Sequence, residues 1–337
     1  MRLAGYLHDT ALVYRLNFQP LPLPARLSAM LRMARMHYSG SYSAPHSILI
    51  GVTGNCQCRC AHCGISYLHK DAELSLETVQ GLLNEYRQMG GIRVIFSGGE
   101  PLLHGDLVAM VRHAARLGLT TFVDSNGLAL TDALARQLAG AGLCVMELSI
   151  DFLDGEKMAE NRGCPDVLDR VKAAIKTCKR AGLSFSINTV AFRENLDGGV
   201  QEIIRYARQV GARCVRVLEP ISVGNMQGRS CTLNPAERQR YLALHEPGYV
   251  ILEQVGKFTS DCSGLNGRFL SIGPDGTVEP CPYMPLPLGN IHEQTLLEIM
   301  HSMQGKIRKI NRTACNCEAG CPVNDPEFQR AHLQADS

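Results

Sequence analysis

The 337-residue chain has no long hydrophobic run and no excess of charge of one sign. No apolar stretch approaches the ~20 residues that span a bilayer. His8 and Asp9 interrupt the early apolar stretch in which a secretory signal would lie. A formal net charge of +2 implies no broad basic surface, which argues against a nucleic-acid partner. We therefore expect a cytoplasmic protein.

Cysteine is the residue type in excess, with fourteen in the chain. Disulfide scaffolds are usually small secreted domains, and in a reducing compartment clustered cysteines more often bind metals or iron–sulfur clusters. Four cysteines lie within residues 56–63 and five within 262–321. The remaining five are scattered. The two groups predict two metal or iron–sulfur sites.

Strand-like and helix-like patterns alternate with short connections between residues 47 and 222. The expected strands are 47–52, 92–96, 119–123, 145–150, 185–190 and 214–218, and the expected helices are 75–89, 106–117, 131–141, 165–181 and 200–210. This alternation predicts an α/β fold with a parallel sheet and right-handed crossovers. Six strands favour an open, partial (β/α)6 barrel over the closed eight-stranded barrel.

Outside this barrel we expect an N-terminal extension over residues 1–46 and a connecting segment over 223–249. A small cysteine-rich domain is expected over 250–325 and a polar tail over 326–337. The extension contains a short helical pattern with Leu27, Met30, Leu31 and Ala34 on one face. We expect this face to pack on the main domain with its arginines solvated, and contact with a membrane is the alternative. The cysteine-rich domain is expected to hold a hairpin of strands 268–272 and 277–279 and a helix over 293–302.

Cys56, Cys60 and Cys63 have the spacing C-x3-C-x2-C in the loop after the first expected strand. Three thiolates can bind three irons of a [4Fe–4S] cube and leave the fourth iron open for a substrate or cofactor. Four thiolates including Cys58 could instead bind zinc, but these spacings do not match the usual paired zinc knuckles.

This motif resembles the signature of the radical S-adenosylmethionine (SAM) superfamily, in which such cysteines follow the first strand of a partial barrel. The resemblance implies that His62 contacts the SAM adenine and that Cys58 is not a ligand. It continues in Gly98-Gly99-Glu100-Pro101, which matches the family's GGEP motif against the SAM amino group. It also implies SAM contacts from later strand ends, for which the candidates are Ser125, Asn126, Ser149, Asp151, Arg162 and Asn188. Each of these later residues could instead be a cap or turn residue.

The C-terminal cysteines resemble the SPASM and twitch extensions of radical SAM enzymes. The shared order is a cysteine, a hairpin with G-x4-C, a Gly-Asn-Ile segment, a helix and further cysteines. A full SPASM domain has seven cysteines, whereas five occur here, so the resemblance implies one auxiliary [4Fe–4S] cluster. The expected ligands are Cys262, Cys281, Cys317 and Cys321, with Cys315 as the alternative to Cys317. A small zinc domain is the alternative reading.

The resemblance implies an oxidoreductase that cleaves SAM reductively and uses the 5′-deoxyadenosyl radical to abstract a substrate hydrogen atom. A peptide or natural product that becomes oxidised or cross-linked is the expected substrate, with flavodoxin or ferredoxin as electron donor. One alternative is an epimerase with Cys231, or next Cys214, as hydrogen donor, although each is more often a small buried residue. Others are an enzyme acting on a lipid or tetrapyrrole, and a non-catalytic zinc or iron–sulfur scaffold.

Overall fold

The structure is a computed structural model, and it describes residues 21, 23–39, 44–65, 71–253, 263–311 and 323. Within that part of the chain the strands form one ten-stranded sheet in the order β10-β9-β8-β1-β2-β3-β4-β5-β6-β7. The strands are β1 (Ser47–Thr53), β2 (Arg93–Gly98), β3 (Thr120–Ser125), β4 (Val145–Ser149), β5 (Phe185–Val190), β6 (Val215–Leu218), β7 (Val250–Leu252), β8 (Phe269–Ile272), β9 (Thr277–Glu279) and β10 (Gly289–Asn290).

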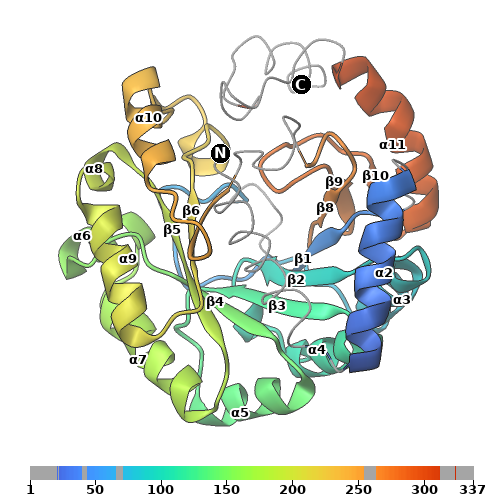
Figure 1. The fold of residues 1–337 in the computed structure, drawn as a ribbon, viewed down its shortest axis with the longest axis horizontal. Coiled ribbons are helices and arrows are strands. Elements are labelled where there is room, and N and C mark those ends of the chain that lie inside the picture. Colours follow the sequence, from blue (N-terminus) through green and yellow to red (C-terminus); the bar gives the residue numbers. More distant parts are fainter. Residues whose placement is uncertain are drawn as a thin grey trace.

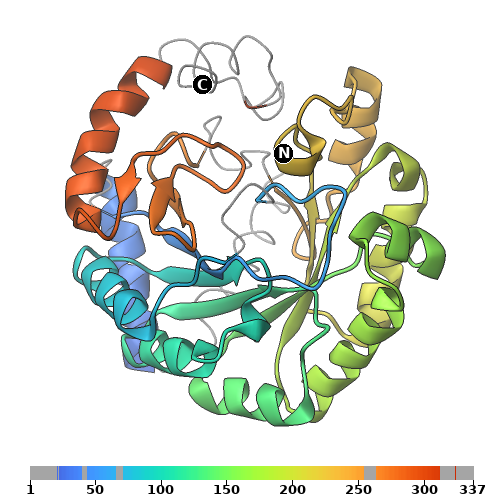
Figure 2. The same ribbon diagram turned by 180° about the vertical axis from the view of Figure 1, so that it is seen from behind.

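The described helices lie on the outer side of this curved sheet, as both views of the fold show (Figures 1 and 2). They are α2 (Leu23–Ser39), α3 (Leu76–Gln88), α4 (Leu107–Arg116), α5 (Asp132–Ala141), α6 (Gly155–Arg162), α7 (Val167–Arg180), α8 (Arg193–Leu196), α9 (Gly199–Val210), α10 (Pro235–Ala243) and α11 (Leu296–Asn311), with short 3₁₀ turns η1 (Pro101–Leu103) and η2 (Gly224–Met226).

The alternation of side chains along each strand separates two cores. On β1, Ile48, Ile50 and Val52 belong to the large core between the sheet and the helices, while Leu49 points the other way. A smaller apolar cluster on the concave face contains Ile95, Phe122, Val145 and Cys214. Because successive residues of a strand face opposite sides, this cluster lies inside the barrel near the first residues of the parallel strands.

The expected α/β class with a parallel sheet is confirmed: β1 to β6 pair in parallel and sequential order. The sheet also extends at both sides of the expected six strands. Strand β7 pairs with β6, and β8 pairs with β1, both in parallel, while β8, β9 and β10 are joined by antiparallel pairing. Helices α6 and α8 and strand β7 were not expected, because each is too short to give a periodic pattern.

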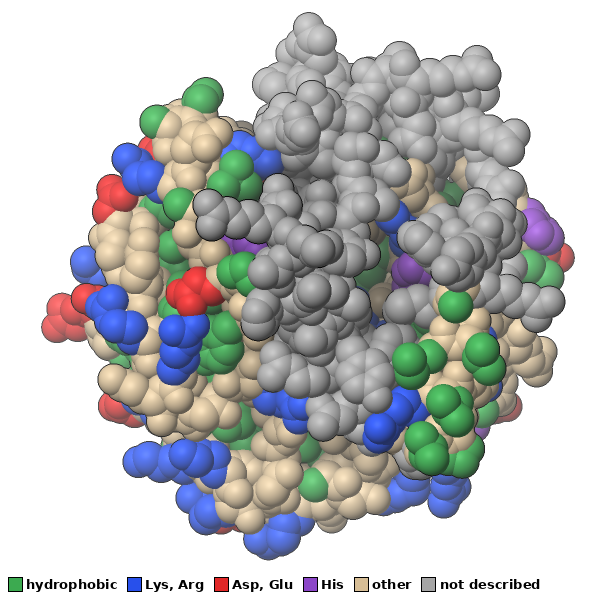
Figure 3. Space-filling view, viewed as in Figure 1, with side chains coloured by type: hydrophobic (Ala, Val, Ile, Leu, Met, Phe, Trp, Pro, Cys, Tyr) green, Lys and Arg blue, Asp and Glu red, His purple; other side chains and the backbone are tan. Residues whose placement is uncertain are grey.

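The expected orientation of the N-terminal helix is wrong. Leu27 and Leu31 of α2 are 52% and 71% exposed, and hydrophobic side chains gather over this helix in Figure 3. Ala29 is instead fully buried, and Arg32 is half-buried, which lowers the pKa of its guanidinium. The side that packs is therefore the one with Ala29 and Arg32, since a small residue allows close approach and an arginine stem covers apolar surface. None of the described helices is long and apolar enough to cross a membrane.

Candidate active site

The clustered cysteines lie in the loop over residues 54–65, directly after β1, at the carboxyl ends of the parallel strands. Ligands of parallel α/β sheets bind at this edge. All four cysteines are free thiols: Cys56 is exposed, Cys60 and Cys63 are half-buried, and Cys58 is buried. We call residues 54–65 the cysteine loop.

The pair Gly98-Gly99, at the end of β2, packs directly against the backbone of this loop. The Gly99 N–H donates to the Thr53 carbonyl and the Glu100 N–H donates to the Asn55 carbonyl, both at 2.7 Å. A Cβ on Gly99 would overlap the Asn55 carbonyl oxygen, and one on Gly98 would overlap that of Thr53. The glycines are therefore required by the backbone of the cysteine loop itself, which passes directly over them.

The C-terminal end of α6 holds a second side of the loop. The Arg59 N–H donates to the Arg162 carbonyl at 2.9 Å, and the Ala61 N–H donates to that of Asn161 at 2.8 Å. The next residue, Gly163, has a φ of +57°, and a Cβ there would lie 2.7 Å from the Arg59 carbonyl oxygen. This contact explains a glycine at the helix end that also suits its left-handed cap.

A third contact comes from η2, which sequence reasoning did not find. The Asn225 backbone N–H donates to the Cys63 carbonyl at 3.0 Å, and its Nδ2 donates to the Cys60 carbonyl at 2.8 Å. A Cβ on Gly224 would overlap the Cys63 carbonyl oxygen. Locally, Gly-Asn is an ordinary turn signal. Its role emerges only because β6 ends beside the cysteine loop.

Glu100 is fully buried, and its carboxylate is used within the protein. Its Oε1 accepts from the Leu102 N–H at 3.1 Å and the Ser125 hydroxyl at 2.7 Å, while Oε2 accepts from the Asn126 N–H at 2.8 Å. Burial raises the pKa of Glu100 to about 7, against the lowering effect of these hydrogen bonds. Pro101 follows at the start of η1, which Glu100 caps. The carboxylate thus joins the GGEP segment to the end of β3.

Asn126 carries this connection to the thiols. Its Nδ2 lies 3.5 Å from Cys58 Sγ and 3.8 Å from Cys56 Sγ, and it donates to Gln57 Oε1 at 3.3 Å. Its Oδ1 accepts from the Leu128 N–H at 2.9 Å, which fixes the amide orientation. The amide therefore presents its donor group to the cysteine loop.

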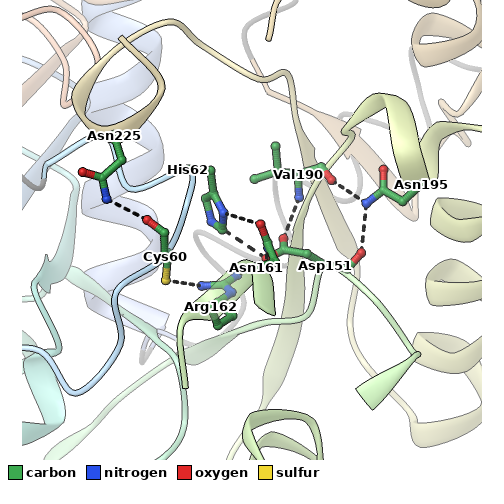
Figure 4. Close-up of polar contacts among 8 residues, drawn as sticks. All are labelled: Cys60, His62, Asp151, Asn161, Arg162, Val190, Asn195 and Asn225. Atoms are coloured by element: carbon green, nitrogen blue, oxygen red, sulfur yellow. Dashed lines mark hydrogen bonds and ion pairs between the residues drawn. The ribbon is translucent and has the colours of Figure 1, made fainter. Parts of the chain in front are cut away.

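Asp151 is the centre of a second buried network, drawn in Figure 4. Arg162 Nη2 lies 2.6 Å from Asp151 Oδ2, which also accepts from Asn161 Nδ2 at 2.9 Å. Asp151 Oδ1 accepts from the Val190 N–H at 3.0 Å, and the Asp151 carbonyl accepts from Asn195 Nδ2 at 2.9 Å. A carboxylate with this many partners holds the ends of β4, β5 and α6 in fixed relation.

Arg162 connects this network to the thiols, since its Nη1 lies 3.8 Å from Cys60 Sγ. The guanidinium also pairs with Asp151, so the expected contact of Arg162 with SAM would be shared with an internal ion pair. Burial would lower the pKa of Arg162, but Asp151 and Cys60 outweigh it and keep the guanidinium charged.

His62 lies between this network and an aromatic pair. Its Nδ1 is 3.4 Å from Asn161 Oδ1, and its ring centroid is 5.2 Å from that of Phe192. Phe192 stacks in turn on Phe152 at 6.1 Å. Burial lowers the pKa of His62, which favours the neutral imidazole. The two phenylalanines were not predicted, because single aromatic residues in loops carry no periodic signal.

The thiols of the cysteine loop have different acidities. The Cys58 thiol lowers the pKa of Cys60 to about 5 by hydrogen bonding, against burial, and Arg162 lowers it further. The same donor lowers the pKa of Cys56, whereas that of Cys58 itself is raised. Burial raises the pKa of Cys63. Cys56 and Cys60 are therefore disposed to be thiolates, the form that binds metal, and Cys58 to stay protonated.

Ser149 and Asn188 are paired in register on β4 and β5, at the same edge of the sheet. Asn188 Oδ1 is buried and has no hydrogen-bond partner among the residues that the structure describes. A ligand with a donor group would satisfy it.

The second cysteine group is described at Cys281 alone, since Cys262, Cys315, Cys317 and Cys321 lie outside the described residues. Cys281 is half-buried and follows β9. The expected hairpin is present as β8 and β9, with Gly276 in its turn at a φ of +83°. Of the proposed hydrogen donors, Cys231 is 8% exposed beside Ser222, and Cys214 is in the concave apolar cluster.

Comparison with known families assigns these features. The profile of the radical SAM superfamily matches residues 50–207, and that of the SPASM iron–sulfur cluster-binding domain matches residues 262–322. The chain belongs to the radical SAM superfamily and is of the SPASM type. It is therefore an enzyme, which overturns the scaffold alternative, and its cofactors are a SAM-binding [4Fe–4S] cluster and an auxiliary iron–sulfur cluster.

Two kinds of named relative match most of the chain. The AdoMet-dependent heme synthase of Methanosarcina barkeri is 28% identical over 78% of this chain and 84% of its own length. The PqqA peptide cyclase of Rhizobium meliloti is 28% identical over 76% of this chain and 74% of its own length.

Solved structures share the fold at lower identity. Streptococcus suis SuiB, bound to the precursor peptide SuiA, aligns with a TM-score of 0.70 at 18% identity, over 89% of this chain and 76% of SuiB. The anSMEcpe structure with AdoMet and the Cp18Cys peptide aligns with a TM-score of 0.63 at 19% identity, over 83% and 88% of the two chains.

Proposed function

We propose that this enzyme oxidises or cross-links a peptide, and that Cys56, Cys60 and Cys63 bind its SAM-binding cluster. The ligand assignment rests on the hydrogen bonds that the cysteine loop makes with the ends of β2, α6 and η2. These bonds hold the loop, and with it the three cysteines, at the carboxyl edge of the sheet. A peptide substrate is supported by the PqqA peptide cyclase relatives and by the peptide complexes of SuiB and anSMEcpe.

The three thiols suit a cluster by their chemistry. They are free, and the lowered pKa values of Cys56 and Cys60 favour thiolates. The described residues contain no group of three His, Cys, Asp or Glu side chains arranged around a single metal ion. A [4Fe–4S] cluster needs no such group, because its thiolates bind separate irons. The resemblance to the family motif leaves Cys58 out of the ligand set, and the neighbouring Cys56 and Cys60 raise the pKa of its buried thiol.

When bound, the cluster supplies the electron that cleaves SAM to a 5′-deoxyadenosyl radical, and we propose flavodoxin or ferredoxin as its source. Around it the protein's groups orient SAM. An ionised carboxylate has about four acceptor positions. Three of those on Glu100 are occupied, so one is left for the SAM ammonium. We propose that the remaining SAM contacts come from His62, Gly98, Gly99, Pro101, Ser125, Asn126, Ser149, Asp151, Arg162 and Asn188.

The rings of His62, Phe192 and Phe152 lie next to one another beside this position. We propose that they keep water from the adenine and from the radical, which would otherwise be quenched. For the auxiliary cluster we propose Cys262, Cys281, Cys317 and Cys321 as ligands, with Cys315 as the alternative to Cys317.

A tetrapyrrole is the second candidate substrate, because heme synthases of three organisms are among the relatives. An epimerase with Cys231 as hydrogen donor is less well supported, because this thiol is buried. A hydrogen donor must reach the substrate radical, whereas Cys231 packs beside Ser222 in a loop that Arg193 binds through the carbonyls of Ser230 and Thr232.

The ligand assignment is tested by single alanine variants of the cysteine loop, reconstituted anaerobically with iron and sulfide. The wild type should bind about eight irons per chain. Cys56→Ala, Cys60→Ala and Cys63→Ala should each lose about four irons and all SAM cleavage to 5′-deoxyadenosine. Cys58→Ala is the matched control and should keep both. SAM cleavage by a variant that lacks all three ligand cysteines would refute the assignment.

The substrate is tested with the reconstituted wild type, SAM and reductant. The precursor peptides SuiA and PqqA and an iron tetrapyrrole are offered in separate reactions. We expect a peptide product that has lost two hydrogen atoms by mass, formed together with 5′-deoxyadenosine. A modified tetrapyrrole with unchanged peptides would reject the peptide proposal in favour of the second candidate.

A further inference from the structure

A second charged group lies inside the barrel, below the proposed SAM site. On the concave face, three residues of the apolar cluster are each followed two residues later by a charged residue. Phe122 is followed by Asp124, Val145 by Glu147 and Cys214 by Arg216. Two residues of a strand advance about 6.6 Å, so these side chains form the next layer toward the carboxyl edge. We call Asp124, Glu147, Arg216 and Glu253 the barrel layer.

Arg216 binds two carboxylates of this layer. Its Nη1 pairs with Glu147 Oε2, and its Nε and Nη2 contact Glu253 Oε1 at 3.0 and 2.8 Å. Ser186 on β5 donates to Glu147 Oε1 at 3.4 Å. Nearly every polar group of Glu147 and Arg216 is thus engaged, and no contact among the described residues uses Glu253 Oε2.

Asp124 completes the layer but is not satisfied by it. It is opposite Glu147 in the β3–β4 register, and the two carboxyl groups share a hydrogen bond. Burial and the charge of Glu147 raise the pKa of Asp124, which favours its protonated form. Its Oδ1 is buried and accepts no hydrogen bond from any residue that the structure describes. A buried acceptor without a donor destabilises the protein.

A purely structural layer would be built differently. Replacing buried ion pairs by apolar side chains is often neutral or stabilising, so charges are an expensive way to fill a barrel. This layer is also open to solvent: the side chains of Arg216 and Glu253 are 18% and 35% exposed, while Glu147 is 2% exposed. Arg216 and Glu253 are therefore partly exposed to solvent, whereas Glu147 is buried beneath them.

Tyr283 links the barrel layer to the cysteine loop. Burial raises the pKa of the Tyr283 hydroxyl, and Glu253 and Arg216 of the barrel layer are close enough to act on it as well. Its ring lies against Gly64, where a Cβ would be 3.1 Å from Tyr283 Cδ1, next to Cys63. Tyr283 also follows Cys281 by two residues. The barrel layer consequently lies where the proposed SAM site, the auxiliary domain and the barrel interior meet.

We propose that the barrel layer is the substrate-recognition site and that Asp124 Oδ1 accepts a hydrogen bond from a nitrogen-borne donor of the substrate, an amide or ammonium group. This inference rests on the proposed function, since it assumes that a radical is formed above the layer. A carboxylate in the same position would offer no donor to Asp124. The site therefore selects amide or amine groups against carboxylates.

The test uses two probes of the same shape, N-acetylglutamine amide and N-acetylglutamate amide, titrated by calorimetry into reconstituted, SAM-loaded protein. The wild type should bind the glutamine probe at least about tenfold more tightly, because a site built around an N–H donor rejects the analogue that lacks it. Asp124→Asn should keep this preference, since an amide also offers an acceptor and a donor toward Glu147. Asp124→Leu should lose it.

Asp132→Leu is the matched control, because Asp132 is an exposed aspartate on α5 that pairs with Arg180 outside the barrel. It should bind both probes as the wild type does, and thermal melting checks that each variant is folded. Equal affinities in the wild type, no binding of either probe, or an intact preference in folded Asp124→Leu would each overturn the inference. Failure of the wild type to bind iron or SAM would instead overturn the proposed function.

Discussion

Glu100 joins three parts of the active site through one carboxylate. It caps η1, binds the backbone at the end of β3, and belongs to the segment that supports the cysteine loop. Full burial makes its charged form unfavourable, and this effect is larger than that of its three hydrogen bonds, so the pKa is raised to about 7. The residue is thus expected to bind SAM best once it has lost its proton.

The raised pKa predicts how stability depends on pH. A group whose folded-state pKa exceeds its unfolded value stabilises the fold below the unfolded value, and this contribution is lost as pH rises through the folded pKa. For Glu100 the change is from 4.5 to about 7, so the free energy of unfolding of the metal-free protein should lose about 3 kcal/mol over that range. Glu100→Gln removes this titration.

Urea unfolding of both proteins from pH 5 to 8.5 measures the effect. The difference in unfolding free energy, wild type minus Glu100→Gln, should fall as pH rises. A difference that stays constant with pH would show that Glu100 is already ionised throughout the range.

The sequence alone predicted which individual residues belong to the site, because they stand in recognisable motifs. It did not predict which residues they contact. The spacing of Cys56, Cys60 and Cys63 is a local pattern, and so is GGEP. Asp151 and Arg162 were both expected near SAM, whereas their direct ion pair depends on how β4 and α6 meet. Partners such as Asn225 and Phe192 come from distant loops with no local signal, and only the fold reveals them.

Among the elements, the connection from β2 to the cysteine loop depends on the absence of side chains. The Gly99 Cα lies so close to the loop that a Cβ would overlap the carbonyl oxygens of Gly54 and Asn55. Both are backbone atoms, so no rotamer change relieves the overlap, and the loop itself has to move.

Gly99→Ala should therefore lose about 1–3 kcal/mol of stability and most of its capacity to retain the SAM-binding cluster. Gly105→Ala is the matched control, because Gly105 is exposed and a Cβ there meets no atom within 4 Å. The control should stay within about 0.5 kcal/mol of the wild type. Thermal melting and iron content are measured for both variants. Equal iron content in the two would contradict the steric explanation.

The elements themselves were largely predictable where the hydrophobic period was long. All six strands expected between residues 47 and 222 are present in parallel order. They could be predicted because a helix of ten residues or more lies between each strand and the next. The short elements α6 and α8 were not predictable. Yet α6 supplies Asn161 and Arg162, so the site depends on an element whose eight residues are too few for a periodic signal.

For the molecule as a whole, the main surprise is that the C-terminal hairpin continues the barrel sheet. Strand β8 pairs with β1 from Ser47↔Phe269 to Ile50↔Ile272, and Leu270 and Ile272 are fully buried in the main core. Sequence reasoning could identify the hairpin but not its neighbour, because strand pairing over more than 200 residues leaves no local trace. The strand that carries the cysteine loop is therefore held on both sides.

This continuity predicts the outcome of removing the auxiliary region. Deleting residues 263–337 would leave the backbone groups along one side of β1 unpaired and remove Leu270 and Ile272 from the core. The result is an exposed sheet edge prone to aggregation.

Cys281→Ala is the control, because it should lose about four irons while leaving β8 in place. Size-exclusion chromatography and iron content compare the two. We expect the truncated chain to aggregate and Cys281→Ala to elute like the wild type. A monodisperse truncated chain that still retains a SAM-binding cluster would mean that β1 is stable without β8.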